Sequence, residues 1–595
     1  MPDMGDADRY DKIMELAKRR GFFWPSYEIY GGVAGFYDLG PLGTRLKENI
    51  VELWRQHFIK RQQHVVVEIE SPIIGPARVY EASGHLEHFT DPIVECLKCG
   101  RKFRADHLIE ERLGIKAEGL SPEEMTRIIR EHDIRCPVCG GPLSEVRRFN
   151  LLFRTTIGPY TQNTGFLRPE TAQGMFVAFK RVYEVSRQRL PLGIAQVGRV
   201  ARNEISPRQG IMRLREFTIA ELEFFFDPED PWHGGVLDEL LDRLGDTKLR
   251  LLTADAKTRG DEKPVEYGVR EAIEEGIITT PWLAYWMAIA RDFVLDLGVG
   301  YNDMYFDEKL PEERAHYAAQ TFDQLVRVSR LGWLEVSGHA YRTDYDLSRH
   351  MRYSGQDLRV FKPLREPRVV ERKIVLVDPR WLGRTLRGKA KEVMEKIRGL
   401  DAETVEKELK ERGYIEVDGV RIPADKVTIA TKKEKITGRK FIPHVAEPSF
   451  GVERLLFVAL DHAYTEKDGR VVLLLPRRIA PVKAAVFPLV RDERLVKIAR
   501  ETWWRLLEAG LYAIYDDDGS IGRRYARVDE IGVPVAVTVD YQTLEDGTVT
   551  LRDRDTWRQV RIPLSNVVEA VAAFVNDNAL SLDAVAERLG LKGGK

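Results

Sequence analysis

The sequence predicts an α+β fold in several domains, and three observations indicate it. The chain has 595 residues, several times the length of a typical single domain. Two apolar stretches, 194–200 and 217–226, flank a polar loop, which is typical of two strands joined by a long connection. From Val471 onwards, short apolar strands alternate with helices. That pattern predicts a separate α/β domain with a mostly parallel sheet.

The composition is that of a globular protein with a heavily charged surface, because 43% of residues are hydrophobic and 31% are charged. We find no run of 18 apolar residues, so we expect no membrane span. Residues 1–20 lack the apolar segment of a secretory signal, and we expect a cytoplasmic location. The net charge of −1 shows no overall basic excess. A nucleic-acid partner remains open, since a local basic face is enough to bind phosphates.

The first 150 residues predict two helices, a strand and an inserted segment. Residues 1–75 predict an amphipathic helix, a Gly-rich turn region and a second helix, and within them the β-branched run 65–69 predicts a strand that ends at Ser71-Pro72. Residues 90–145 carry the cysteines and have a helical middle. Ser121 followed by Pro122 and Glu124 is a good helix start.

The rest of the chain contains a charged insert and a last domain. Residues 385–415 are rich in Lys and Glu, and short strands with an Asp418-Gly419 turn follow them. A solvated helix face is the favoured interpretation of this stretch, with RNA contact as the alternative. In the last domain we expect strands at 482–487, 513–515 and 533–539 and a helix at 491–509.

The four cysteines form two CxxC pairs, Cys96 with Cys99 and Cys136 with Cys139. In a reducing compartment such pairs favour a metal over disulfides. Thiolates at this spacing, each pair followed by Gly, suit a closed tetrahedral structural zinc site. The interval between the pairs exceeds the usual compact spacing, but a helix could fill it. Four free thiols are the alternative.

The stretch after the polar loop carries two acidic residues on one face. Alternation places Glu221 and Glu223 on the same side of the strand, pointing out of the sheet, opposite an apolar face. A half-exposed hairpin with solvated charges would explain this pattern equally well. Arginines beside such carboxylates suit phosphate chemistry, however, because a guanidinium group binds two phosphate oxygens bidentately and stays charged.

The loop itself resembles motif 2 of the class II aminoacyl-tRNA synthetases. Arg202-Asn203-Glu204 and the later Arg213 carry the likeness, and 202–226 resembles the glycyl-tRNA synthetases closely. The resemblance implies that Arg202 grips the α-phosphate of ATP and Glu204 contacts the adenine end. It also implies that Phe217 stacks on the adenine and that Arg213 holds the outer phosphates.

Two further segments resemble the other motifs of this class. Residues 447–454 look like motif 3, in which Arg454 reaches the γ-phosphate side of ATP and Glu447 contacts Mg²⁺. Residues 70–76 resemble motif 1, which forms a dimer interface around a central Pro, and a homodimer is therefore expected. The resemblance implies the following ATP-binding set: Arg202, Asn203, Glu204, Met212, Arg213, Phe217, Glu335, Val336, Glu447, Gly451 and Arg454.

Residues 166–174 are similar to a signature of glycine-specific members. In that family Glu170, Glu221 and Ser449 would surround the substrate ammonium. Carboxylates in a small site hold an ammonium well, and side chains that fill the space beyond the α-carbon exclude larger amino acids. Arg342 corresponds to the contact on the substrate carboxylate, and Arg104 is a weaker candidate. Surface ion pairs are the alternative for both arginines.

Segments 516–526 and 550–555 resemble the anticodon-binding domain shared by several class II enzymes. Arg523, Arg524 and Tyr525 would offer charge and a stacking face to single-stranded bases. Arginines paired with neighbouring aspartates are the alternative.

Together these likenesses imply a class II antiparallel sheet flanked by helices, with a zinc-binding insert and a C-terminal anticodon-binding domain. The expected parts are 1–90 with motif 1, 91–148 with zinc, 149–354 with motif 2, the insert 355–440, 441–475 with motif 3, and 476–595 for the anticodon. The implied activity attaches glycine to tRNA(Gly) through glycyl-adenylate, with ATP, Mg²⁺ and structural Zn²⁺. A class II synthetase of another specificity and a non-catalytic nucleic-acid-binding relative are the alternatives.

Overall fold

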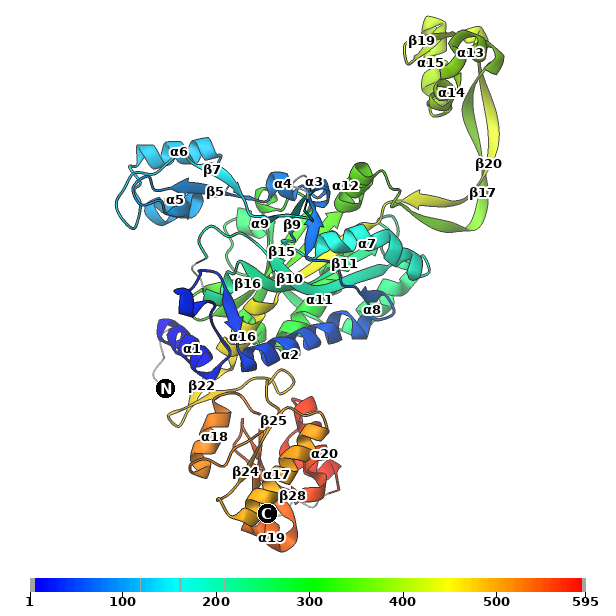
Figure 1. The fold of residues 1–595 in the computed structure, drawn as a ribbon. Coiled ribbons are helices and arrows are strands. Elements are labelled where there is room, and N and C mark those ends of the chain that lie inside the picture. Colours follow the sequence, from blue (N-terminus) through cyan, green and yellow to red (C-terminus); the bar gives the residue numbers. More distant parts are fainter. Residues whose placement is uncertain (1–5, 118, 160–162, 208–209, 591–595) are drawn as a thin grey trace. The chain divides into compact units, whose positions relative to one another are not determined.

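The computed structural model describes residues 6–117, 119–159, 163–207 and 210–590 (Figure 1). The chain divides into two compact units, Met1–Leu358 with Pro443–Lys595 and the intervening Arg359–Ile442. No helix in the described ranges is both long enough and apolar enough to cross a membrane.

The larger unit is built on a nine-stranded sheet. In spatial order its strands are β13 (Val265–Gly268), β12 (Lys248–Leu252), β14 (Met304–Glu308), β15 (Gln320–Val328), β16 (Gly332–Thr343), β21 (His444–Gly451), β11 (Glu216–Phe226), β10 (Leu192–Ala201) and β3 (Val66–Glu68). Neighbouring strands run antiparallel, except that β12 is parallel to β14 and β10 is parallel to β3. The antiparallel sheet that the family resemblance implies is therefore confirmed.

One face of this sheet packs on long helices. Phe224 of β11 contacts Trp282 of α11 (Pro281–Asp296), with ring centroids 4.3 Å apart. Trp54 of α2 (Pro41–Phe58) packs edge-on against Phe450 of β21. The residues of α11 are apolar over most of the helix and nearly all buried, because the helix lies in the core of the unit.

A shorter helix covers part of the opposite face. Phe176 of α7 (Ala172–Val185) packs edge-on against Phe225 of β11, with centroids 5.9 Å apart. Glu221 and Glu223 share this face, as their alternation predicts, and both are buried. The alternative of a solvated hairpin is therefore wrong, since α7 screens this part of the sheet from water.

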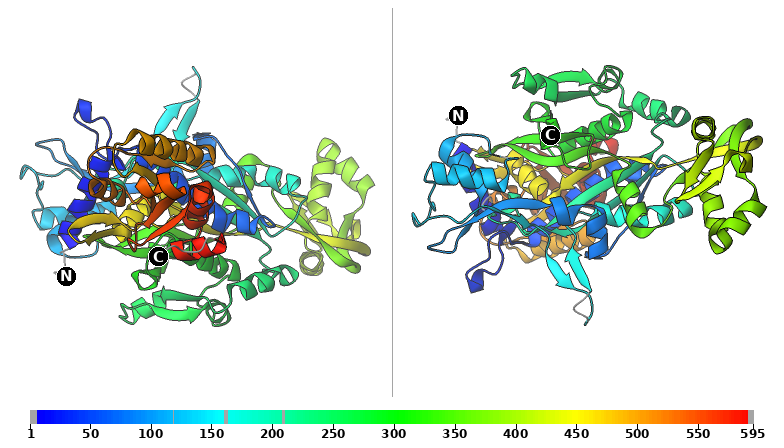
Figure 2. Two further views of the ribbon diagram at one scale, coloured as in Figure 1. Left: turned by 90° about the horizontal axis from the view of Figure 1, so that it is seen from below. Right: turned by 90° about the horizontal axis from the view of Figure 1, so that it is seen from above.

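Further helices and hairpins complete this part of the larger unit. They are α1 (Asp6–Arg20), α3 (Ala77–Ala82), α4 (His85–His88), α8 (Val236–Leu244), α9 (Ala254–Thr258), α10 (Val269–Glu274), α12 (Tyr345–Ser354) and α16 (Val452–Ala463), with strands β1 (Phe23–Pro25), β2 (Tyr37–Leu39), β22 (Tyr464–Lys467) and β23 (Arg470–Leu473). A small sheet joins β4 (Ile74–Pro76), β9 (Thr164–Leu167) and β8 (Arg154–Thr156). The β8–β9 hairpin extends away from the body of the unit (Figure 2).

The cysteine-bearing segment has a core of its own. Strands β6 (Lys102–Arg104), β5 (Thr90–Glu95) and β7 (Arg147–Asn150) form a sheet, and α5 (Ala105–Leu113) and α6 (Pro122–Glu131) pack beside it. The predicted helix start is confirmed, because the Ser121 hydroxyl accepts from the Glu124 amide and the Glu124 carboxylate accepts from the Ser121 amide.

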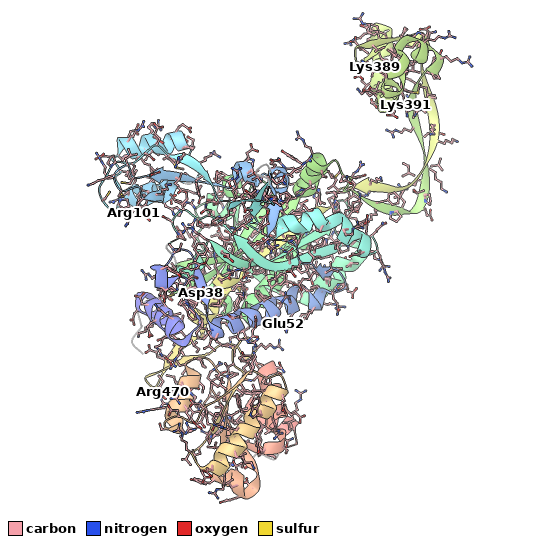
Figure 3. The ribbon with its side chains drawn as sticks, viewed as in Figure 1. Asp38, Glu52, Arg101, Lys389, Lys391 and Arg470 are labelled. Atoms are coloured by element: carbon pink, nitrogen blue, oxygen red, sulfur yellow. The ribbon has the colours of Figure 1, made fainter. Side chains whose placement is uncertain are left out.

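The smaller unit is a long two-stranded arm that carries a compact tip. Strands β17 (Val360–Val377) and β20 (Val427–Phe441) pair along their length. The tip contains α13 (Pro379–Leu386), α14 (Ala390–Arg398), α15 (Ala402–Arg412), β18 (Tyr414–Val417) and β19 (Val420–Pro423) around a small apolar core. Residues 359–442 hold 23 Lys and Arg against 14 Asp and Glu, so the unit is positively charged. Lys389 and Lys391 are exposed on its tip (Figure 3).

The C-terminal domain has a five-stranded sheet in the order β25 (Ala513–Tyr515), β24 (Ala484–Pro488), β26 (Val535–Val539), β27 (Thr548–Asp553) and β28 (Gln559–Pro563). The expectation of a mostly parallel sheet is only partly right. The first three strands are parallel and the last two are antiparallel to their neighbours. The reason is the short connection after β26, since a parallel strand needs a crossover of a dozen or more residues.

Helices α17 (Glu493–Glu508), α18 (Ile521–Asp529), α19 (Tyr541–Asp546), α20 (Val567–Asn576) and α21 (Leu582–Arg588) complete this domain. Two of the residues expected to meet bases make contacts within the domain. Arg524 is buried and donates to the carbonyl oxygens of Leu489 and Gly519, and the Tyr525 hydroxyl lies 2.6 Å from that of Thr538. Arg523 is exposed.

Candidate active site

Five residues on adjacent strands form one row across the sheet. Pairing places Gln196 of β10 opposite Glu221, Glu221 opposite Ser449, Ser449 opposite Gly338, and Gly338 opposite Asp323. Directly paired residues project from the same face of a sheet. All members of the row except Gln196 line one site, although they are far apart in sequence.

A cavity of about 300 Å³ lies over this row. Its walls combine acidic residues, arginines and aromatic rings. Among the lining residues are Glu170, Arg202, Glu204, Arg213, Phe217, Glu221, Tyr317, Asp323, Glu335, Gly338, Glu447, Ser449 and Arg454. A cavity of this size with a few convergent charged groups is typical of a small-molecule site.

Glu221 is held by the first turn of α7. Its Oε2 accepts from the backbone amides of Thr171, at 2.6 Å, and Ala172, at 3.1 Å. Its Oε1 accepts from the Ser449 hydroxyl at 2.8 Å. The carboxylate therefore fixes the helix end to the strand, where the positive end of the helix favours an anion. Burial and the nearby Glu170 nevertheless raise the pKa of Glu221.

Glu170 lies immediately before the same helix. Its Oε1 accepts from the Gln173 amide at 2.9 Å, and His85 Nε2 lies 3.5 Å from its Oε2. Burial opposes ionisation of this group, yet His85, Arg342 and Gln173 together lower the pKa of Glu170. Glu170 is thus an ionised carboxylate in the cavity wall.

Glu447 is joined to a fully buried arginine. Arg342 Nη1 donates to Glu447 at 2.9 Å, while its Nε and Nη2 donate to the two oxygens of Asp346 at 2.8 and 3.0 Å. Burial raises the pKa of Glu447 to about 7 although Arg342 acts against it. This end of the cavity has an excess of acidic groups and can accept one more cation.

The other end of the cavity is rich in arginine. The Arg202 guanidinium lies 5.3 Å from the centre of the Phe217 ring and donates to the Pro169 carbonyl at 3.0 Å. Arg213 donates to Glu204 at 2.8 Å. An anion with several oxygens would find two guanidinium groups here beside a flat aromatic face.

Arg454 completes the basic end from the first turn of α16. Its Nε donates to the Met212 carbonyl at 3.1 Å and its Nη1 to the Glu335 carbonyl at 2.8 Å. The Glu335 carboxylate lies 3.3 Å from the same nitrogen. The strand-to-helix passage at Gly451 was predicted and is confirmed, since β21 ends at Gly451 and α16 begins at Val452.

Most of the predicted site residues meet in this one cavity. Those in its lining are Glu170, Arg202, Glu204, Met212, Arg213, Phe217, Glu221, Glu335, Val336, Glu447, Ser449, Gly451 and Arg454. Asn203, Arg342 and Arg104 are not in it. Arg342 lies behind Glu447, and Arg104 pairs with Asp106 and lies 3.3 Å from Asp91. Asp91 in turn lies 3.9 Å from Arg213.

The lining residues that sequence reasoning missed include Tyr317, Asp323 and Gly338. Tyr317 belongs to an irregular segment before β15 and has no motif around it. Asp323 and Gly338 reach the cavity only because their strands pair beside the strand of Ser449. The alternation in β15 places Asp323 on one face of its strand, but no local signal says which face bounds a cavity.

The four cysteines converge in the insert. Their sulfur atoms all lie within 4.8 Å of one another, with 3.5 Å between Cys96 and Cys139 and 3.8 Å between Cys99 and Cys136. Helices α5 and α6 fill the long interval between the two pairs, as expected. Four soft donors at this separation fit one tetrahedral zinc ion.

Comparison with known proteins agrees with this geometry. The family described as "tRNA synthetase class II core domain (G, H, P, S and T)" matches residues 160–463, and the "Anticodon binding domain" matches residues 483–574. A glycine–tRNA ligase of Aeropyrum pernix is 60% identical over 96% of this chain and 98% of its own length. The chain belongs to the glycine–tRNA ligase family.

Two further glycine–tRNA ligases and one solved structure are also similar to this chain. Glycine–tRNA ligases of Pyrococcus abyssi and Methanocaldococcus jannaschii are 48% and 46% identical, and each match covers 95% of this chain and 98% of the relative. A solved prolyl-tRNA synthetase of Cryptosporidium parvum aligns over 97% of this chain and 78% of its own, with a TM-score of 0.48 and 14% identity.

The two ends of the cavity match, in charge, the two small substrates of a glycine–tRNA ligase. The class II core uses ATP and Mg²⁺, and the basic end has the charge that a nucleotide requires. The acidic end has the charge that an ammonium group requires.

Proposed function

We propose that this chain is a glycine–tRNA ligase, which forms glycyl-adenylate from glycine and ATP and then transfers the glycyl group to tRNA(Gly). One observation carries the proposal. Glu170 and Glu221 lie in the same cavity as Arg202, Arg213 and Arg454. A site for an amino acid and a site for a nucleotide are thereby joined, as adenylate formation requires.

The nucleotide would occupy the basic end. We assign Arg202 to the α-phosphate, Arg213 and Arg454 to the outer phosphates and Phe217 to the adenine ring. These arginines are preorganised by backbone carbonyls and by Glu204, so they need little rearrangement when charge develops on the phosphates. Glu204, Met212, Val336 and Gly451 would complete the nucleotide site.

Glycine would occupy the acidic end, with its ammonium at Glu170, Glu221 and Ser449. Its carboxylate then faces the α-phosphate and attacks it in line, releasing pyrophosphate. The terminal ribose hydroxyl of tRNA next attacks the carbonyl of the adenylate and releases AMP. Both steps depend on positioning and charge stabilisation, and neither requires a covalent enzyme nucleophile.

Arg342 and Arg104 keep weaker parts in this scheme. Arg342 was predicted to contact the substrate carboxylate, but its described bonds go to Asp346 and Glu447. We therefore assign it to holding Glu447. Arg104 shares Asp91 with Arg213, so we assign it to positioning Arg213. The backbone amide of Asn203 donates to the carbonyl oxygen of Leu151, so we assign Asn203 to supporting the loop.

Two metals belong to the proposal. When bound, Mg²⁺ spreads charge between the phosphates of ATP. As the resemblance implies, Glu447 would contact it, since the bond from Arg342 goes to one of its two carboxylate oxygens. Zinc would be held by Cys96, Cys99, Cys136 and Cys139, and such a closed site serves structure because it leaves no open coordination position.

A homodimer is also proposed, as motif 1 implies. A mainly apolar groove of about 440 Å³ runs along motif 1 and α7, lined among others by Pro72, Ile74, Val79 and Val177. Ile74 and Val177 are 46% and 55% exposed. Exposed apolar side chains along a groove suit a protein interface. Light scattering should give twice the mass of the chain, and a monomer would refute this part.

We further assign the positive arm, residues 359–442, to contact with the tRNA backbone. Its excess of Lys and Arg suits phosphates, and such binding weakens as salt rises. Val360 pairs with Phe441 at its base, so a short linker can replace it. Without the arm, the KM for tRNA should rise while glycine-dependent pyrophosphate exchange persists. An unchanged KM for tRNA would contradict the assignment.

The decisive test is ATP–pyrophosphate exchange with each of the twenty amino acids. Glycine alone should support rapid exchange. Exchange with another amino acid would favour a class II synthetase of different specificity. The absence of ATP binding would favour a non-catalytic relative.

A further inference from the structure

One wall of the acidic end comes from a segment that no motif covers. Residues 314–319 connect the short turn Pro311–Glu313 to β15. The Ala319 amide donates to the Tyr341 carbonyl at 2.8 Å, and the Ala318 amide donates to the Ala315 carbonyl at 2.9 Å. The segment is thus attached to the end of β16 rather than free in solution.

The middle of the segment is fixed on its outer side by His316. The His316 ring packs on His88 of α4 at 4.6 Å and on Tyr345 of α12 at 5.4 Å. Its Nε2 lies 3.2 Å from the Ser83 carbonyl oxygen. Three independent contacts therefore define where the next residue, Tyr317, can place its ring.

Tyr317 points inward and stacks on the buried arginine of the acidic end. The Arg342 guanidinium lies 3.8 Å from the centre of the Tyr317 ring, close enough for a cation–π interaction. Asp346 and Glu447 hold that guanidinium from the side. The ring thus lies on a rigid support.

The same ring lines the cavity together with Glu170, Glu221 and Ser449. Ala340 and Ser449, which also line the cavity, have small side chains. In the described part of the chain, the Tyr317 hydroxyl has no hydrogen-bond partner. Burial raises the pKa of Tyr317 well above its usual value, so the hydroxyl remains a donor.

We infer that Tyr317 is a specificity-determining residue, whose ring fills the volume into which the side chain of any larger amino acid would extend. This inference rests on the proposed placement of glycine between Glu170 and Glu221. The carboxylates select an ammonium group, which every amino acid has. Rejection of alanine needs a wall that cannot move, and the stack on Arg342 gives the ring that rigidity.

The test compares alanine with glycine in ATP–pyrophosphate exchange. Tyr317→Ala should raise the ratio of kcat/KM for alanine to that for glycine by at least about tenfold, because one methyl group is discriminated by roughly 10- to 200-fold in a tight site. Tyr317→Phe keeps the ring and should leave the ratio unchanged. Tyr301→Ala is the matched control, since Tyr301 also stacks on an arginine, Arg291, but is not in the lining.

An unchanged ratio in a Tyr317→Ala protein with normal melting temperature and normal KM for ATP would overturn the inference. Should that variant fail to fold, Tyr317→Leu, which is narrower than the ring but apolar, must raise the ratio, and no rise would again overturn it. Glu221→Gln separates this outcome from failure of the site itself. If Glu221→Gln leaves the KM for glycine unchanged, the placement of glycine is wrong. If it raises that KM while Tyr317→Ala leaves the ratio unchanged, only the role of Tyr317 is wrong.

Discussion

Glu221 and Ser449 face each other across neighbouring strands, and the Ser449 hydroxyl donates to Glu221 at 2.8 Å. This bond joins the strand of motif 2 to the strand of motif 3. The other oxygen of Glu221 accepts from the first turn of α7, beside the glycine signature. Three segments that are distant in sequence thus meet at one carboxylate.

Glu221→Gln should weaken glycine binding and leave ATP binding nearly intact. The amide keeps the size of the side chain but loses the charge that pairs with an ammonium. Loss of one charge-assisted hydrogen bond costs about 1.5–3 kcal/mol, which is roughly a 10- to 100-fold rise in the KM for glycine. Pyrophosphate exchange measures both KM values. Glu216→Gln, on the same strand but outside the cavity lining, is the control and should change neither KM value.

Arg454→Lys should lower kcat/KM for ATP by about 100-fold, in the range found when one preorganised donor is removed. Lysine keeps the charge but cannot bond Met212 and Glu335 while also reaching a phosphate with a planar fork. The same change at the exposed Arg352 of α12 provides the comparison. Equal kinetics in the two variants would remove Arg454 from the nucleotide site.

Glu223→Gln should stabilise the protein increasingly as pH rises from about 5 to 8. Burial and the adjacent Glu447 raise the pKa of Glu223 well above its usual value. In the described part of the chain neither of its carboxyl oxygens has a hydrogen-bond partner. The folded state therefore keeps a proton that the unfolded state releases near pH 4.5, so this group makes stability fall as pH rises.

The glutamine variant removes that dependence. Melting temperatures of the two proteins should be similar near pH 5, and the variant should lie increasingly above the wild type towards pH 8. A gap that is the same at every pH would mean that Glu223 is ionised in the folded protein.

Cys99→Ser should abolish zinc binding, because a closed site of four thiolates loses a ligand. Metal analysis of the purified chain should give about one zinc ion per chain for the wild type and much less for the variant. The insert should then become sensitive to proteases, since its two CxxC pairs are no longer tied together. Val138→Ala changes an exposed residue within the second pair and should retain the metal. If the wild-type protein contains no zinc and is still stable, the four cysteines are free thiols and the zinc assignment is wrong.

The sequence determined the elements and most of the charged groups of the site by itself. Arg202, Arg213 and Arg454 could be found because they lie in short segments that resemble motifs 2 and 3 of the class II synthetases. The helix start at Ser121 and the passage at Gly451 also depend on neighbours within a few residues. Such features are local, so the order of residues is enough to predict them.

Only the tertiary structure decided which of these groups share a cavity. Strand pairing brings Asp323 and Gly338 to the row of Glu221 and Ser449, and no local pattern contains that register. Burial beneath α7 turned Glu223 from an expected solvent-facing charge into an unpaired buried acid. Arg524, which was expected to meet bases at the surface, is also buried. Burial depends on what packs over a residue, and those residues come from distant parts of the chain.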